Sequence, residues 1–220
     1  MPLTYAEEHR ALQDRFDTRR LADTLLEVIV HDEITDADRA FITSRDMFWL
    51  ASVDPAGQPT VSYKGGAPGF VAVLDARTLA FPCFDGNGMY YSMGNMVANP
   101  QIGLLFMDFE TPFRLRVQGS ATHDDDPTLM ARFPGAQFVV RVAVSAIFQN
   151  CPRYVHRMKK VADSSYVPAA DGTAPLAGWK RLDFIQPSLP GYDRGRTEAA
   201  GGPLSIEEWS AKVAAGDPQA

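Results

Sequence analysis

Residues 78–109 read TLAFPCFDGNGMYYSMGNMVANPQIGLLFMDF, and the pattern within them decides the fold. The apolar runs at residues 78–83 and 102–109 have the composition of β-strands. Residues 89–98 between them can form one short helix, which has to end near Asn99 because a residue before proline is biased away from helical geometry. The predicted local order is therefore strand, glycine-rich turn, short helix, strand.

The turn before this helix has several features of an anion-binding site, although residues 78–113 contain no lysine or arginine. A helix N-terminus exposes unpaired N–H groups and a partial positive charge. Gly86 and Gly88 would let the backbone approach a ligand closely, and Asn87 and Ser92 add neutral hydrogen-bonding groups. From the residues alone, an anion cradle and a capped helix between two strands both remain open.

Further short strands are predicted on both sides of this stretch. Residues 47–53, 60–64 and 70–75 precede it, and residues 113–123 and 137–150 follow it, with tight turns such as DPAGQP and ETP between strands. Short strands in succession favour a closed antiparallel barrel over a parallel α/β sheet. The predicted fold class is therefore α+β, mainly β.

Helices are predicted at both ends of the chain. Residues 5–16, 19–30 and 35–46 have helical apolar spacing, with a capping box at Thr4 and an N-cap at Thr35. Residues 163–203 are rich in Pro, Gly and Ala and should be extended, without a second core. A final helix at residues 203–216 has Ser205 as its cap. We expect three parts: helical residues 1–45, the barrel at 46–160, and a tail at 161–220 that wraps over the barrel or a partner subunit.

Composition bounds the class of protein. The net charge of −6 argues against a nucleic-acid-binding surface. The N-terminus has no signal-peptide core and no apolar run is long enough to span a bilayer, so we expect a soluble cytoplasmic protein without membrane contacts. Cys83 and Cys151 form no CxxC pair and the histidines show no ligand spacing, so no metal site is predicted.

Three groups of polar residues are candidates for a site. Ser62 and Lys64 lie two apart on a predicted strand, so they face the same side, and Lys64 is either a cation for a phosphate or a solvated edge residue. Arg114, Arg116 and Gln118 share one face in the same way, which is either a solvent face or a polar wall. Gln149 and Asn150 end the long strand at residues 137–150, and Cys151 after them is either a redox thiol or a packed side chain.

The order of these motifs resembles the pyridoxamine 5′-phosphate oxidase-like, FMN-binding split-barrel superfamily. The resemblance covers residues 41–154 and rests on FWLASVDPAGQPTVSYKGG, on residues 70–108 and on RLRVQGSA. It is similar to a bacterial branch marked by SxKGGxPGF at residues 62–70, GNxxxxSxxN at residues 86–95 and NCPRY at residues 150–154.

The resemblance implies an antiparallel split barrel and a homodimer with FMN in clefts at the subunit interface. Tyr91 and Ser92 fall where the true vitamin B6 oxidases place an arginine and a lysine on the phosphate, which leaves Lys64, Ser92, the helix N-terminus and Arg116 to hold it. The residues implied for cofactor binding are Ser62, Tyr63, Lys64, Phe81, Pro82, Asn87, Met89, Tyr91, Ser92, Asn95, Arg114, Arg116, Gln118, Gln149 and Asn150.

The expected function is an FMN-dependent oxidoreductase that acts on a small molecule. Its expected partners are a small-molecule substrate or an electron donor. The true vitamin B6 oxidases end in a segment of arginines and a histidine that holds the substrate phosphate, and this chain lacks such a segment, so we do not expect pyridoxamine phosphate oxidation. Two alternatives stay open: a non-enzymatic flavin-binding protein for storage or sensing, and a reductase that uses the deazaflavin F420. No catalytic acid or base stands out, as suits chemistry carried by a flavin.

Overall fold

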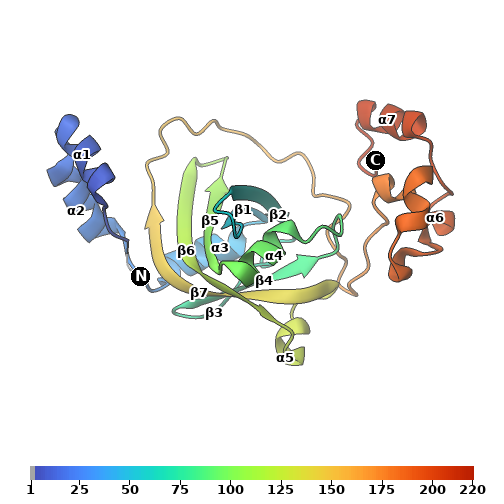
Figure 1. Cartoon of the computed structure of the whole chain (residues 1–220), viewed down its shortest axis with the longest axis horizontal. Helices are drawn as coiled ribbons and strands as arrows, with labels where there is room; N and C mark the ends of the chain where they lie inside the picture. The colour runs from blue at the N-terminus through green and yellow to red at the C-terminus, as the bar shows by residue number, and fades with distance from the viewer. Residues whose placement is uncertain (1–2) are drawn as a thin grey trace. The chain divides into compact units, whose positions relative to one another are not determined.

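The computed structural model describes residues 3–220, which form two compact units that divide after Lys160. The first unit holds the β-sheet and five helices. Figure 1 labels these elements. Within the described part of the chain, every helix is too short or too polar to cross a membrane.

Seven antiparallel strands form the sheet of the first unit, in the order β2-β1-β5-β6-β7-β4-β3. The predicted antiparallel split barrel, with N-terminal helices and a short C-terminal helix, is confirmed. The sheet is curved but not closed, because the outer strands β2 and β3 each pair with one neighbour. The strands are β1 (Met47–Val53), β2 (Pro59–Gly65), β3 (Ala72–Asp75), β4 (Thr78–Phe84), β5 (Gln101–Asp108), β6 (Phe113–Asp124) and β7 (Ala136–Gln149).

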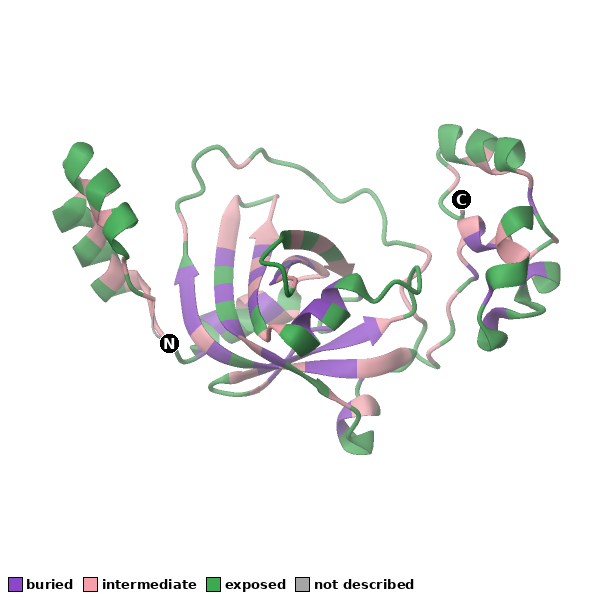
Figure 2. Cartoon of the chain, in the orientation of Figure 1, coloured by how far each residue is buried: buried purple, intermediate pink, exposed green. Residues whose placement is uncertain are grey.

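The core lies inside this curved sheet. Alternate residues of each strand point inward, and Figure 2 shows the resulting stripes of buried residues. The Phe48 ring lies at the centre, with the rings of Phe70, Phe81 and Phe106 at 5.7, 5.1 and 5.3 Å. In the register of β1 and β2, Phe48 is opposite Lys64. Lys64 therefore points to the same face of the sheet as the core, and this register positions the functional site.

The helices of the first unit are α1 (Glu7–Arg15), α2 (Arg19–Ile29), α3 (Asp36–Ser44), α4 (Tyr91–Ala98) and α5 (Pro127–Met130). Thr35 caps α3 as predicted, since its Oγ1 accepts from Asp38 N at 3.2 Å. The predicted cap at Thr4 is wrong, because the N-cap of α1 is Ala6, whose N–H donates to His9 Nδ1 at 3.0 Å.

The second unit is compact and contains short helices within residues 163–203, which were expected to be extended. It contains buried leucines, three short 3-10 helices, a four-residue helix α6 (Arg196–Ala199) and α7 (Ile206–Ala214). The predicted capping box of α7 is confirmed, since Ser205 Oγ accepts from Glu208 N at 3.1 Å. A buried ion pair joins Lys180 Nζ to Asp193 Oδ2 at 2.7 Å. The 3-10 helices are Gly178–Arg181, Asp183–Ser188 and Gly191–Asp193.

Candidate functional site: a cavity at the start of helix α4

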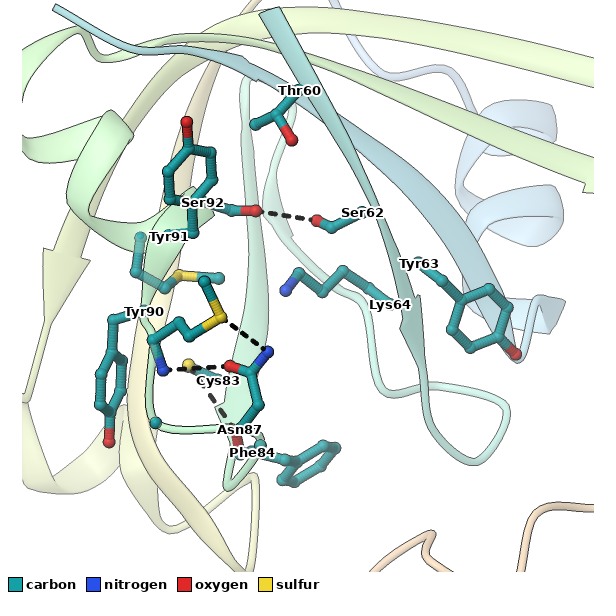
Figure 3. A pocket seen from close by; sticks show the side chains of 14 residues that line it. Thr60, Ser62, Tyr63, Lys64, Cys83, Phe84, Asn87, Tyr90, Tyr91 and Ser92 are labelled. Carbon is teal, nitrogen blue, oxygen red and sulfur yellow. Dashed lines mark hydrogen bonds between the residues drawn. The ribbon is translucent and has the colours of Figure 1, made fainter. Parts of the chain in front are cut away.

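A cavity of about 470 Å³ opens between the edge strand β2, the end of β4 and the start of α4. Its volume falls within the range of small-molecule sites, roughly 300–1,000 Å³. Figure 3 shows the side chains around it. The lining residues are Thr60, Ser62, Tyr63, Lys64, Cys83, Phe84, Gly86, Asn87, Gly88, Met89, Tyr90, Tyr91, Ser92 and Met93.

Strand β2 supplies a polar wall. Thr60, Ser62 and Lys64 alternate along it and face inward, opposite Ser52, Leu50 and Phe48 of β1. Lys64 extends into the cavity in Figure 3. Burial lowers the pKa of its ammonium group, an effect that the nearby Cys83 partly opposes. Throughout residues 3–220 no side chain or carbonyl pairs with this ammonium group, so it is free to bind an anion.

Cys83 lies at the end of β4, on the opposite wall from β2. Its side chain is buried, and burial raises the pKa of the thiol, although Lys64 favours the thiolate. The raised pKa keeps the thiol neutral, so Lys64 keeps its positive charge uncompensated by a thiolate.

The loop before α4 is shaped by two residues with local requirements. Asn87 Oδ1 accepts from Met89 N at 3.0 Å, which tightens the turn. Gly88 has a φ of +73°, in the left-handed region that glycine adopts without strain. Asp85 is the acidic residue of this loop, and it is exposed.

Helix α4 begins without a side-chain cap, unlike α3 and α7. Its first helical hydrogen bond runs from Gly94 N to the carbonyl oxygen of Tyr90 at 2.7 Å. The N–H groups of Tyr91, Ser92 and Met93 have no acceptor in the part of the chain that the structure describes. All three residues line the cavity, so the partial positive charge of the helix N-terminus adds to that of Lys64.

Two hydroxyl-based contacts hold α4 against the sheet. Ser92 Oγ donates to Ser62 Oγ at 3.0 Å across the cavity, as Figure 3 shows. One turn further on, the buried Asn95 Nδ2 donates to Ser52 Oγ at 3.2 Å. The cavity therefore combines one cation, several hydroxyl groups and free N–H groups, which is a donor set suited to a phosphate.

Tyr90 connects the same loop to the other side of the sheet. Its hydroxyl donates to Gln137 Oε1 at 2.8 Å, and its ring stacks on Phe138 with 6.4 Å between centroids. The backbone of Tyr90 has a φ of 47° and a ψ of 28°, which is the left-handed conformation. Sequence reasoning missed this residue, because the contact depends on β7 lying beside β4 in space.

The cavity brings together nine of the residues that the sequence pointed to: Ser62, Tyr63, Lys64, Gly86, Asn87, Gly88, Met89, Tyr91 and Ser92. Phe81, Pro82 and Asn95 are buried beside it and do not line it. Phe81 packs into the aromatic core instead. Sequence reasoning did not include the lining residues Thr60, Cys83, Phe84, Tyr90 and Met93. Of these, Thr60 had a signal, since it alternates with Ser62 along one strand.

The remaining residues lie away from this cavity. Arg114, Arg116 and Gln118 point to the outer face of β6, since Leu115 and Val117 between them are buried. Arg114 Nη2 donates to the carbonyl oxygen of Cys151 at 2.9 Å, and Asn150 N donates to the carbonyl oxygen of Arg114 at 3.4 Å. Gln149 lines a separate pocket of about 370 Å³ beside His31.

Cys151 is exposed, so the alternative in which it packs in the interior is wrong. Its Sγ accepts from Arg153 N at 3.4 Å. No group of three or more potential metal ligands gathers within residues 3–220.

Comparison with known proteins identifies one family. The family model described as pyridoxamine 5′-phosphate oxidase matches residues 34–162, a span that contains the whole cavity. No curated protein matches the chain.

Solved structures of similar fold share low identity with the chain. A variant of HupZ from group A Streptococcus is 22% identical, with a TM-score of 0.44, over 53% of this chain and 99% of that one. A Lactobacillus delbrueckii protein, provisionally described as a pyridoxamine 5′-phosphate oxidase, is 26% identical, with a TM-score of 0.43, over 54% and 95%. An FMN-binding protein from Syntrophomonas wolfei is 11% identical, with a TM-score of 0.42, over 64% and 97%.

Proposed function

This chain belongs to the pyridoxamine 5′-phosphate oxidase family, and from this premise we propose that it binds FMN in the Lys64 cavity and works as a flavin-dependent oxidoreductase on a small molecule. The observation that carries the proposal is the half-buried, unpaired ammonium group of Lys64, which shares one cavity with the uncapped N-terminus of α4.

The donor set of the cavity fits the phosphate of FMN. A phosphate monoester carries close to two negative charges at neutral pH and accepts several hydrogen bonds. Lys64 would supply the cation, Ser62 and Ser92 the hydroxyl donors, and the first turn of α4 the N–H groups. The apolar part of the lining, with Met89 and Tyr91, suits a flat aromatic ring.

When bound, the flavin supplies the hydride or electron transfer. The chain's own residues in the cavity bind and orient it. The cavity contains no carboxylate or histidine, and burial keeps the Cys83 thiol protonated by raising its pKa. These residues therefore contribute binding and a fixed electrostatic environment, and Lys64 and the tyrosines are the proton-bearing side chains besides Cys83 and the hydroxyl groups of Thr60, Ser62 and Ser92 in the lining.

The proposal includes a homodimer with the flavin at the interface. The outer face of β1 and β2 supports it, because Val61 and Tyr63 are exposed there beside Ala51 and Trp49. Tyr63 lies on this outer face and also borders the cavity at the edge of the sheet. Arg116 and Gln118 also face outward, on β6. In a dimer, such outward residues would reach the cavity of the second copy and complete its polar wall. Sedimentation of the flavin-loaded protein should give a dimer at micromolar concentration, and a loaded monomer would contradict this part.

The visible absorption spectrum of the purified protein tests the cofactor. We expect flavin bands, and mass spectrometry of the ligand released by acid should identify FMN. Release of F420 would favour the reductase alternative. A colourless protein that binds neither added FMN nor added F420 would overturn the proposal.

Anaerobic mixing of the loaded protein with NADH or NADPH tests the enzyme against the storage alternative. Bleaching of the flavin within seconds and its reoxidation by an added acceptor would support an oxidoreductase. A flavin that dissociates readily but accepts no electrons from either donor would favour storage or sensing.

A further inference from the structure

The backbone of Tyr90 adopts a conformation that bulky side chains rarely take. Its φ of 47° and ψ of 28° are left-handed, where the Cβ atom crowds the following carbonyl oxygen. Such strain persists where the surrounding structure holds the residue in place, and it gathers at functional sites.

Two contacts hold Tyr90 in this conformation. Its hydroxyl donates to Gln137 Oε1 at 2.8 Å, and its ring stacks on Phe138 at an interplanar angle of 29°. Both partners belong to β7, which pairs with β4 on one side and with β6 on the other. Phe138 is opposite Cys83 in this register. The clamp is therefore attached to the first residues of β7, where this strand pairs with β4 and does not yet pair with β6.

Tyr154 provides a matched comparison within the same chain. It also has a positive φ, 69°, and its side chain is 89% exposed. Among residues 3–220 its side chain has no hydrogen-bond or ring partner. A left-handed tyrosine in this protein thus has no general need of a clamp, so the clamp of Tyr90 is a feature of the loop beside the cavity.

The clamp determines where the first turn of α4 points. The helix starts directly after Tyr90, and the carbonyl oxygen of Tyr90 accepts its first helical hydrogen bond. A phosphate can use several N–H groups at once only if their directions are fixed before it binds, since ordering a loose loop costs binding free energy. The loop contributes no cation to the cavity lining. Binding of a phosphate therefore depends more on the fixed directions of these N–H groups than it would in a site with several cationic side chains.

We propose that Tyr90 is a positioning residue, whose clamp on Gln137 and Phe138 makes the cavity selective for a flavin that carries a phosphate over one that does not. The proposal rests on the proposed function, because it concerns the same cavity. It assigns the selectivity to a residue that does not itself provide a cation or a hydroxyl group to the phosphate.

Titrations of the full-length protein with FMN and with riboflavin, followed by flavin fluorescence, test the proposal. Tyr90→Phe and Gln137→Met each remove the clamping hydrogen bond and keep the side-chain volume. Each should weaken FMN binding about 3- to 10-fold, the range for one neutral hydrogen bond, and leave riboflavin binding unchanged. The double variant should be no weaker than either single variant, since both remove the same bond. Tyr154→Phe should match the parent protein.

Amide hydrogen exchange of the flavin-free protein gives a second readout. Tyr90→Phe should speed exchange in residues 86–93 and leave the other strands unchanged. Inorganic phosphate should slow exchange at residues 91–93 in the parent and less so in the variant. These exchange results stand even if the parent binds no FMN, which would contradict the proposed function and not the clamp. Equal losses of FMN and riboflavin affinity, or parent-like exchange in both variants, would overturn the proposal.

Discussion

At the scale of single residues, the site depends on one ammonium group that points inward from an edge strand. Lys64 lies opposite Phe48, so its chain packs along the core while its charge reaches the cavity. Burial lowers the pKa of this group, because removal from water disfavours the charged form. An anion in the cavity would relieve that cost, and this is the physical reason for an affinity toward phosphate.

Replacement of Lys64 by alanine should weaken FMN binding by about 1.5–3 kcal/mol, the scale of a charged hydrogen bond. Fluorescence titration measures this, with circular dichroism to show that the fold is kept. Lys159→Ala removes an exposed lysine outside the cavity and serves as the control. If Lys64→Ala binds FMN as well as the Lys159 variant, the phosphate lies elsewhere.

The affinity for FMN should also depend on pH through Lys64. The phosphate stays a dianion above about pH 7, while the ammonium group must keep its proton to bind it. Since the pKa of Lys64 is lowered, affinity should fall with rising pH below the usual lysine range near pH 10.4. Titrations from pH 7 to pH 10 should show this decline in the parent and a flat profile in Lys64→Met. A decline of the same size in both would assign the pH dependence to another group.

Gly88 and Gly86 make a matched pair for testing the loop. A Cβ atom at either position would meet open space, but only Gly88 has a φ in the left-handed region, +73°. Gly88→Val should therefore lower both FMN affinity and stability, by roughly 1–2 kcal/mol of backbone strain, while Gly86→Ala should change little. Titration and thermal unfolding of both variants measure the difference. Equal effects would show that the backbone at residue 88 is not restrained.

The sequence correctly predicted those site residues whose placement depends on residues close to them along the chain. The alternation of Ser62 and Lys64 places both on one face, and Asn87, Gly88 and Ser92 follow from turn and helix chemistry. Cys83 and Tyr90 could not be recognised, because their positions depend on β4 and β7 pairing across more than fifty residues of sequence. The outward orientation of Arg114 and Arg116 was open for the same reason: the pattern fixes one shared face but not which face is buried.

At the scale of elements, the contact between β6 and β7 depends on a glycine. A Cβ atom on Gly119 would lie 2.5 Å from the carbonyl oxygen of Ala143, at a point where the register of the two strands shifts. Gly103 on β5 has only Ala51 Cβ at 3.8 Å. Gly119→Ala should destabilise the protein by about 1–3 kcal/mol, as overpacking does, and Gly103→Ala should be near neutral. Urea unfolding measures both, and a neutral Gly119→Ala would show that the strands can separate locally at no cost.

The strands and the longer helices were predictable because their signals are local. Residues 47–53 were predicted as a strand and form β1 with the same limits, and α7 begins at its predicted cap, Ser205. The short helices between residues 127 and 199 were missed. The segments of three or four residues are too short for an apolar repeat, and Pro187 lies inside one of the 3-10 helices. The leucines of this region are buried, and no apolar periodicity in the sequence predicts their burial.

At the scale of the whole molecule, the second unit has an ion pair in its interior. The second unit buries the Lys180–Asp193 ion pair, with side chains 5% and 0% exposed, whereas the Lys212–Asp217 pair of the same unit is 39% and 29% exposed. Asp193→Asn should destabilise residues 161–220 by about 3–5 kcal/mol, because it removes the buried negative charge that Lys180 Nζ and Arg196 Nη1 both contact. Asp217→Asn should cost at most about 1 kcal/mol. Hydrogen exchange measured over residues 161–220 compares them, and similar losses would mean that water reaches Lys180.

The strand order of the sheet also governs how the protein is made. The last strand in sequence, β7, pairs with both β6 and β4. Strand β1 pairs with β5, which is synthesised later than β2, β3 and β4. Until β5 is synthesised, the growing chain can pair only β1 with β2 and β3 with β4, which gives two separate hairpins with bare apolar faces. Non-local pairings of this kind are slow, since the entropy of closing a long loop is lost before any contact stabilises it. The growing chain is therefore expected to expose these apolar faces during its own translation, at least until residue 149 has left the ribosome and β7 can pair with β4 and β6.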